Sequence, residues 1–302
     1  MSIRLDKLVS ERFGLSRRAA QEAVLTGRVD LDGSRCDEPG RLVERDADLR
    51  FDPNRPKSRR VVGKELISVL HEDAHILIVD KPPGLPTVPS FEGEEDTLLA
   101  RVERYLAIRR GGRPFVGVVH RLDKDTSGAL AVALSPEARD GLQALFRAHA
   151  LERQYLAVVE GRVGPAQGTI DLNLITDEGT LRRRVARRPG EGRRAVTHFR
   201  VIEHYGRVAS LLACWLETGR THQLRLHLVE IGHPVVGEPV YRPRHQPKSK
   251  ARFARQALHA QTLGFVHPRT GRDVRVEAPP PGDLAALIED LRRRYGLAGA
   301  GG

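Results

Sequence analysis

The chain has 302 residues, of which 40% are hydrophobic, so it can bury one large core beside a small module, or two medium-sized cores. Its formal net charge of +11 indicates a polyanionic partner, either nucleic acid or an acidic membrane surface, with a merely solvated basic surface as the alternative. The absence of any apolar run of about 18 residues excludes a membrane-spanning helix, and two cysteines exclude a disulfide framework or a Cys-rich zinc site. The first residues lack the apolar core of a signal peptide, so we expect a cytoplasmic protein.

Residues 1–52 are predicted to form a small α/β domain. Ser16 is a favourable N-cap for a helix over residues 17–26. After this helix, Asp32 and Gly33 lie between two alternating apolar segments, which is the pattern of a β-hairpin turn. The order of these signals predicts a helix followed by a hairpin.

Arg17 and Arg18 open this helix, where the helix dipole opposes positive charge. A phosphate would remove the conflict, because free backbone N–H groups and two guanidinium groups would converge on it. The alternative is a pair of solvated arginines. Residues 53–64, which are basic and interrupted by proline, are predicted to be a linker.

Residues 65–296 are predicted to form a strand-rich domain, followed by a frayed tail over residues 297–302. Strands are expected in the apolar or alternating runs at residues 76–80, 116–120, 129–135, 154–161, 197–203 and 208–217. Helices are expected from Pro136, over residues 222–231 and over residues 282–290. Because strands and helices do not alternate regularly, we expect an α+β domain with a largely antiparallel mixed sheet.

Two basic stretches interrupt this domain. Residues 182–194 hold seven arginines, and residues 242–255 hold six lysines or arginines. A run of charge is usually a solvated loop. In a protein that is already basic, we interpret both stretches as loops that contact phosphate.

The densest group of reactive side chains is HRLDKDTSG, residues 120–128, between two predicted strands. It places His120, Arg121, Asp123 and Thr126 at the end of a strand, and we interpret it as a candidate active site. The alternative is an Asx-rich turn that only joins the two strands.

A second group, ETGRTHQLRLHL over residues 217–228, leads into a predicted helix on which Gln223 and His227 share one face. Arg225 lies next to the apolar stripe, where it is hard to bury without an anion, so a carboxylate of the first group is the expected partner. His222 and His227 could ligate a metal ion. No Cys or acidic residue of suitable spacing joins them, which favours packed or hydrogen-bonded histidines.

Two further features of the sequence are weaker indications of a site. Tyr155 shares a strand face with Ala157 and Val159, which is typical of a core tyrosine with a satisfied hydroxyl. The segment DKPPGLPTVPS, residues 80–90, is predicted to be a rigid loop that positions a site or simply connects two elements.

The strand-end sequence DKDT, residues 123–126, also matches the pattern of haloacid-dehalogenase-type phosphatases, in which the first Asp is a nucleophile assisted by Mg²⁺. That fold requires a parallel sheet and late acidic metal ligands. The antiparallel sheet and the terminal helix expected here argue against it.

Five segments, in order, resemble RluA-type pseudouridine synthases: residues 69–90, 120–128, 153–161, 217–241 and 255–274. Together they span roughly residues 66–290, and five motifs in one order are far more specific than one. Residues 2–51 resemble the small RNA-binding module named after the S-four ribosomal protein, which often precedes this catalytic domain.

The resemblance implies an isomerase that needs no cofactor or metal and that detaches a uracil from its ribose, turns it and rejoins it through carbon. It implies that Asp123 is the essential carboxylate, attacking the sugar carbon or removing a sugar proton. Arg225 would pair with Asp123 and keep it ionised, and Tyr155 would meet the uracil. RNA would be bound by the remaining motif residues, namely His120, Arg121, Thr126, His222 and Gln223, and by Arg17 and Arg18 in the N-terminal module.

The expected target is large-subunit ribosomal RNA, and the expected protein is a monomer without a membrane partner. A transfer RNA target is the first alternative. A catalytically silent ribosome-assembly factor that only binds RNA is the second, although such a protein would not need Asp123, Tyr155 and Arg225.

Overall fold

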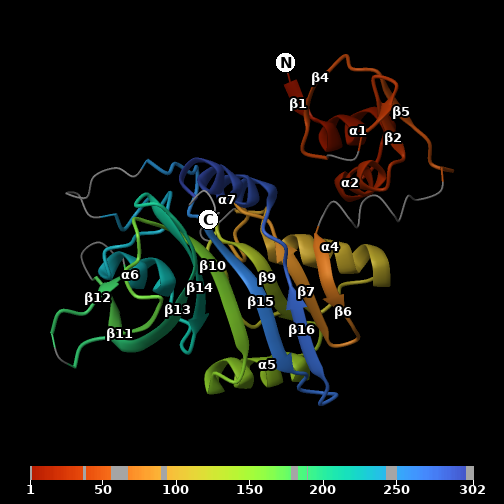
Figure 1. Ribbon diagram of the computed structural model, residues 1–302. Coiled ribbons are helices and arrows are strands. Elements are labelled where there is room, and N and C mark those ends of the chain that lie inside the picture. Colours follow the sequence, from red (N-terminus) through yellow and green to blue (C-terminus); the bar gives the residue numbers. More distant parts are fainter. Residues whose placement is uncertain are drawn as a thin grey trace, which may run out of the picture. The chain divides into compact units, whose positions relative to one another are not determined.

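The computed structural model describes residues 2–36, 39–55, 67–89, 94–177, 183–188, 190–242 and 250–296 (Figure 1). The predicted tail and most of the predicted linker lie outside these residues. The chain separates into two compact units, Met1–Ser68 with Arg101–Pro114, and Val69–Ala100 with Phe115–Gly302. Helix α4 (Leu98–Arg110) spans the junction of these ranges. Among the described residues, no helix is long and apolar enough to cross a membrane.

Within the described residues 2–55, the first unit forms two short helices and two small sheets, and the unit also includes most of α4. The helices are α1 (Leu5–Phe13) and α2 (Arg17–Leu25), and the strands are β1 (Ser2–Arg4), β2 (Val29–Leu31), β3 (Ser34–Arg35), β4 (Leu42–Glu44) and β5 (Leu49–Phe51). β1 pairs with β4, and β2 lies between β3 and β5. Buried side chains of both helices, such as Leu5, Leu8 and Val24, pack with those of β2 and β5 into one core.

Local sequence accounts for this unit. The Ser16 hydroxyl accepts a hydrogen bond from the N–H of Ala19 at 3.2 Å, so α2 begins at Arg17, as predicted. Asp32 and Gly33 have φ of 51° and 77°, the left-handed conformations that a tight hairpin requires, and they join β2 to β3. The predicted cap and the predicted hairpin are both confirmed.

The second unit is built on one large sheet. Its strands are β6 (Ser68–Glu72), β7 (Ile76–Lys81), β8 (Gly117–Val118), β9 (Ser127–Ala133), β10 (Glu152–Glu160), β11 (Gln167–Thr176), β12 (Arg183–Val185), β13 (Arg193–Tyr205), β14 (Ala209–Leu216), β15 (Leu258–Val266) and β16 (Asp273–Glu277). Within the described ranges their order is β12-β11-β13-β14-β10-β15-β9-β7-β6, with β16 beside β15 and β8 beside β9. β15 and β9 run parallel, whereas β10 and its two neighbours run antiparallel. This confirms the predicted α+β fold with a mixed, largely antiparallel sheet.

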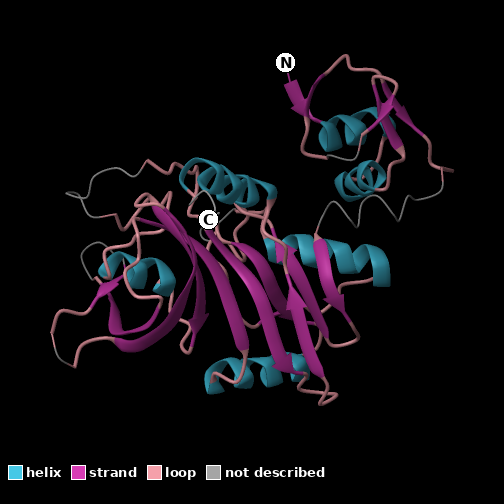
Figure 2. Ribbon diagram, in the orientation of Figure 1, coloured by secondary structure: helices cyan, strands magenta, loops and turns pink. Residues whose placement is uncertain are grey.

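Helices α5, α6 and α7 lie around this sheet (Figure 2). α5 (Pro136–Ala148) buries Ala138 and Leu142 in a core shared with β7, β9 and β15. α6 (Gln223–Glu230) contributes Leu226 to a smaller core with β11, β12 and β13. α7 (Gly282–Tyr295) buries one face of leucine and isoleucine and extends beyond the predicted residues 282–290.

Gly128 brings two strands unusually close together. It is the second residue of β9, has φ of +115°, and faces Ala260 of β15 in the parallel pairing. A Cβ atom at position 128 would lie 2.1 Å from the backbone oxygen of Ala260, so no other residue fits without moving a strand. The backbone that immediately follows the candidate catalytic loop is therefore fixed inside the sheet, between β15 and β7.

Two predictions about this unit were wrong. Residues 116–120 form only the two-residue strand β8, because the His120 ring nitrogen Nε2 accepts the Ala131 N–H at 3.0 Å and a side chain thus replaces a strand carbonyl. Residues 182–194 are not one loop: β12 occupies Arg183–Val185 and β13 begins at Arg193, since buried Val185 packs in the core around α6. Half of the other basic stretch, residues 243–249, lies outside the described residues.

His227 leads to a prediction about stability. Its side chain is fully buried on α6, and neither ring nitrogen has a partner among the described residues. Burial lowers its pKa from 6.5 to about 4. As the pH falls through 6.5, this histidine takes up a proton in the unfolded chain before it does so in the folded protein. The contribution of neutral His227 to the free energy of unfolding is therefore fully present above pH 6.5 and falls below it, by about 2 kcal/mol at pH 5.

Urea unfolding at pH 7 and pH 5 measures this effect. In His227→Gln, the difference in unfolding free energy between the two pH values should shrink by about 2 kcal/mol relative to the wild type. An unchanged pH dependence would show that His227 does not titrate in this range.

Candidate active site

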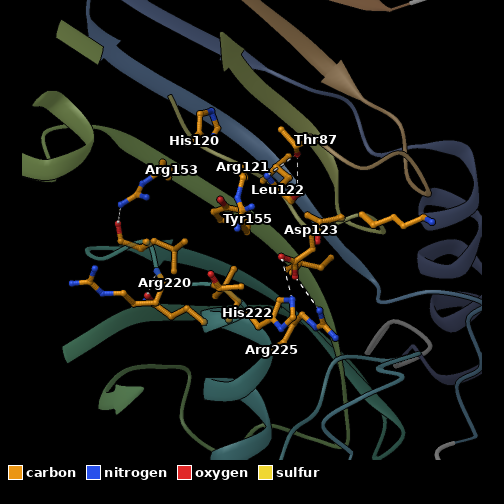
Figure 3. Close-up of a pocket in the computed structure, with 18 of the residues that line it drawn as sticks. Thr87, His120, Arg121, Leu122, Asp123, Arg153, Tyr155, Arg220, His222 and Arg225 are labelled. Carbon is orange, nitrogen blue, oxygen red and sulfur yellow. Dashed lines mark hydrogen bonds and ion pairs between the residues drawn. The ribbon is translucent and has the colours of Figure 1, made fainter. Parts of the chain in front are cut away.

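A cavity of about 940 Å³ in the second unit collects most of the predicted site residues (Figure 3). It is lined by the loop before β9, by β10 and by the segment that enters α6. Asp123, Tyr155 and Arg225 meet in it, together with five predicted RNA-binding residues: His120, Arg121, Thr126, His222 and Gln223. Arg17 and Arg18 belong to the first unit.

The loop that carries Asp123 is held by backbone hydrogen bonds. The Asp123 carbonyl accepts the N–H of Thr126 at 3.1 Å, which closes a turn. The Thr87 hydroxyl donates to the Leu122 carbonyl at 2.9 Å and accepts the Leu122 N–H at 3.2 Å. The predicted rigid loop over residues 80–90 therefore fixes the residue directly before Asp123.

Lys81 links the same two loops through hydrogen bonds of its side chain. Its side chain is fully buried, and its ammonium group donates to the carbonyls of Pro82, Leu85 and Lys124 at 2.7–2.9 Å. Burial lowers the pKa of Lys81 to about 7, against the opposing effect of Asp125 and Asp123. This lysine was not predicted from the sequence, although its position directly after the run Ile76–Asp80 of a buried strand was the available signal.

Arg225 connects two carboxylates. Its Nη1 donates to Asp123 Oδ2 at 3.1 Å, which is the contact expected from the sequence. Its Nε and Nη2 donate to the two oxygens of Glu238, both at 2.7 Å. Although burial opposes the charge, these bonds to Glu238 and Asp123 raise the pKa of Arg225, so it stays a cation. Glu238, whose side chain is fully buried, was missed, yet it is the only acidic residue between 231 and 272.

His222 flanks the other oxygen of Asp123. It has φ of 58° and precedes α6, so the helix begins at Gln223 and not at His222 as predicted. Its Nε2 lies 3.7 Å from Asp123 Oδ1, and its Nδ1 is hydrogen-bonded to the hydroxyl of Tyr241. Burial lowers the pKa of His222. No group of three or more residues suited to a metal ion was found in the described part of the chain.

Tyr155 lies across the pocket on β10. Only 9% of the residue is exposed, yet its hydroxyl has no hydrogen-bond partner among the described residues, unlike the satisfied core tyrosine that composition alone favours. Burial raises the pKa of the phenol, and the nearby Arg153 opposes this rise. The ring is therefore packed while the hydroxyl stays available to a ligand.

The other predicted contact residues differ in their exposure and in whether their side chains already contact other protein groups. Thr126 and Gln223 are each 2% exposed, and their side chains are hydrogen-bonded to protein groups. The ring of His120 stacks on Phe146 with centroids 4.5 Å apart. Arg121 is exposed, and no partner for it occurs within the described ranges. Of these four, Arg121 is the side chain best placed to contact a substrate.

The helix end in the first unit is less open than the sequence suggested. Arg17 Nε lies 3.8 Å from the buried carboxylate of Asp6, so an aspartate of α1 partly neutralises this arginine. The side chain of Arg18 lies outside the described residues.

The sequence matches the family described as RNA pseudouridylate synthase over residues 75–230, and the S4 domain over residues 3–49. It is 40% identical over 234 residues to the ribosomal large subunit pseudouridine synthase D of Zymomonas mobilis, covering 74% of this chain and 73% of that protein. It is 36% identical over 304 residues to the protein of the same name from Escherichia coli, covering 97% and 91%. The solved structure of human RNA pseudouridylate synthase domain containing 4 has the same fold, with a TM-score of 0.64 at 23% identity over 78% of this chain and 97% of that one.

The fold, the pocket and these matches define an RNA-modifying isomerase preceded by an RNA-binding module. The chain belongs to the RNA pseudouridylate synthase family, and its reaction converts uridine in RNA to pseudouridine. The resemblance noted in the sequence is confirmed for both parts of the chain, and the phosphatase alternative is excluded.

Proposed function

We propose that this pseudouridine synthase modifies large-subunit ribosomal RNA. Relatives at 36–40% identity carry names that specify this substrate, and one of them aligns over 97% of the chain. The S4 domain and the net charge of +11 support a large, structured RNA over a short one. The proposal includes a monomer acting in the cytoplasm, with an RNA-binding domain over residues 1–52, a linker over residues 53–64 and a catalytic domain over residues 65–296.

Mapping of pseudouridines tests this substrate. Deleting the gene should remove one or more pseudouridines from large-subunit ribosomal RNA and leave transfer RNA unchanged, and re-expression should restore them. Loss of pseudouridine from transfer RNA alone would establish the alternative substrate. An unchanged pattern in both would contradict the proposal.

Asp123 is proposed as the essential carboxylate. The observation that carries this assignment is its position in the pocket, with Arg225 at one oxygen and His222 near the other, and with Tyr155 lining the same pocket. The carboxylate would attack the anomeric carbon or remove the neighbouring sugar proton as the base departs. The base then turns, and its carbon 5 bonds to the sugar carbon as the bond from that carbon to Asp123 breaks, or as Asp123 returns the proton to the neighbouring carbon. The proton on carbon 5 then leaves.

Further residues are proposed to hold the RNA. Arg121, exposed and without a partner among the described residues, would contact the backbone of the flipped-out nucleotide. His120, Thr126, His222 and Gln223 would shape the pocket around it. Arg17 and Arg18 would contact phosphates from the N-terminal domain.

Salt dependence of RNA binding tests the proposed role of Arg17 and Arg18. In the full-length protein with Arg17→Gln and Arg18→Gln, the slope of log affinity against log salt should fall by roughly 0.7 to 0.9 for each phosphate that is no longer neutralised. Arg50→Gln is the matched control, because Arg50 is an exposed arginine of the same unit. Equal slopes for the double variant and the control would rule out phosphate binding by these two arginines.

Tyr155 is proposed to pack its ring on the uracil and to assist removal of the carbon 5 proton. Tyr155→Phe keeps the ring and removes only the hydroxyl, so RNA affinity should stay within about threefold while product formation falls by roughly 10²-fold. Tyr155→Ala should fail in both respects. Full activity of Tyr155→Phe with an inactive Tyr155→Ala would restrict the role to the ring, and two active variants would remove Tyr155 from the site.

A further inference from the structure

Arg153 is a buried cation on the inward face of β10. It precedes Tyr155 by two residues, so both side chains lie on the same face of the strand, and both line the pocket. Only 7% of Arg153 is exposed. The guanidinium packs against the ring of Phe146, with its carbon 5.5 Å from the ring centroid.

No carboxylate pairs with this arginine within the described residues. Its Nη2 donates to the carbonyls of Leu216 and Glu217, at 3.1 and 3.4 Å. Its Nε is buried without a partner, and no partner of its Nη1 was found in the described ranges. Burial lowers the pKa of Arg153 because the charge lacks compensation. A buried, incompletely bonded cation is costly, which indicates a ligand that completes its hydrogen bonds.

The position of Arg153 specifies which part of a uridine it would meet. The charges of Asp123 and Arg153 both act on the Tyr155 phenol, with opposite effects on its pKa. Figure 3 shows Tyr155 between the other two side chains. A uridine with its sugar carbon at Asp123 and its base over Tyr155 would therefore direct its base toward Arg153. A backbone phosphate would stay nearer the exposed rim, where Arg121 and Arg147 lie.

Gly219 leaves room for this guanidinium. A Cβ atom on Gly219 would lie 2.8 Å from Arg153 Nη1, and Gly219 lines the same pocket. Because φ at this position is not positive, backbone conformation does not call for glycine here. The space is instead used by the end of the Arg153 side chain.

We propose that Arg153 is a catalytic residue that donates a hydrogen bond to a carbonyl oxygen of the target uracil and stabilises the negative charge of the detached base. The proposal rests on the roles assigned above to Asp123 and Tyr155. When the bond between the sugar carbon and nitrogen 1 breaks, its electron pair stays on the base and spreads onto both carbonyl oxygens. The sugar carbon gains either a bond to the Asp123 carboxylate or a double bond to the neighbouring carbon, formed by the electrons of the broken sugar C–H bond. Arg153 transfers no proton. The negative charge of the base is consumed when carbon 5 bonds to the sugar carbon, as the bond from that carbon to Asp123 breaks or the neighbouring carbon regains its proton.

Single-turnover kinetics at saturating RNA test the proposal. Because the charge appears only after bond cleavage, Arg153→Gln should slow the reaction by about 10²- to 10³-fold and leave RNA affinity within about threefold. Arg153→Lys should recover part of the rate. Arg272→Gln is the matched control: it removes an exposed arginine of the same unit that does not line the pocket, and it should change neither turnover nor RNA affinity by more than about threefold. Loss of affinity at an unchanged rate in Arg153→Gln would instead assign Arg153 to a phosphate and overturn the proposal.

RNA with 5-fluorouridine at the target gives a second measurement. Fluorine stabilises the detached anion, so disappearance of the 5-fluorouridine should be slowed less by Arg153→Gln than disappearance of uridine. Equal slowing on both RNAs would contradict the proposal. If thermal melting shows that Arg153→Gln is unfolded, the same comparison is made with Arg153→Lys, in which a weaker cation should also give the smaller loss on the fluorinated RNA. Asp123→Asn in the same assay distinguishes failure of the proposed active site from failure of the proposed role of Arg153. An active Asp123→Asn would contradict the assignment of the active site. An inactive Asp123→Asn together with a fully active Arg153→Gln would contradict only the role of Arg153.

Discussion

Asp123→Asn is expected to abolish pseudouridine formation, with a loss on the order of 10⁴-fold or more, and to leave RNA binding within a few-fold. Asn has the shape of Asp and can still accept a hydrogen bond from Arg225 at the position of Oδ2. It cannot attack the sugar or take a proton, and no other carboxylate occupies this position in the pocket. Release of tritium from RNA that contains 5-tritiated uridine measures turnover directly.

Asp125→Asn is the matched control for this experiment. Asp125 lies two residues further along the same loop and also lines the pocket, and its backbone carbonyl, which is unaffected by the change, accepts from Arg255. The control should keep activity within a few-fold. If Asp123→Asn released tritium at the wild-type rate, the assignment of the essential carboxylate would be wrong, and an inactive Asp125→Asn would move it to Asp125.

Glu238→Gln is expected to destabilise the protein by about 3 kcal/mol, because it breaks a buried pair and leaves the Arg225 cation with Asp123 as its only carboxylate partner among the described residues. Urea unfolding measures the loss. Turnover should fall as well, since Arg225 loses the two 2.7 Å bonds that orient it toward Asp123.

A double-mutant cycle separates pairing from simple packing. Arg225→Met removes the cation, so adding Glu238→Gln to it should cost much less than Glu238→Gln costs alone. Additive losses of stability would show that Glu238 acts independently of Arg225. Retained activity in Glu238→Gln would limit Glu238 to a stabilising role.

Part of this site followed from the sequence because the relevant signals were local. A strand-end loop rich in polar residues placed Asp123, and the difficulty of burying Arg225 predicted a carboxylate partner, which Asp123 is. The apolar and alternating patterns of single strands and helices, and their irregular order along the chain, were likewise enough to predict the mixed sheet. These features depend on residue spacing, which the sequence displays directly.

The missed residues depend on contacts between distant segments. Glu238 reaches Arg225 only after the chain turns back past α6, and nothing in its spacing reveals the bidentate geometry. The end of β8 depends on the Ala131 N–H, which donates a hydrogen bond to the His120 ring, and strand propensity does not predict such a contact. Arg153 did have a local signal, since the strand face shared by Tyr155, Ala157 and Val159 extends back to it.

The close approach at Gly128 limits how this enzyme could be retargeted. A broader choice of substrate calls for a catalytic loop that can be reshaped, yet position 128 is locked against the backbone of Ala260 five residues after Asp123. Libraries that vary residues 123–128 should therefore yield mostly inactive proteins. Diversity introduced at exposed rim positions such as Arg121 and Arg147 would leave the sheet untouched and could alter which uridine is selected.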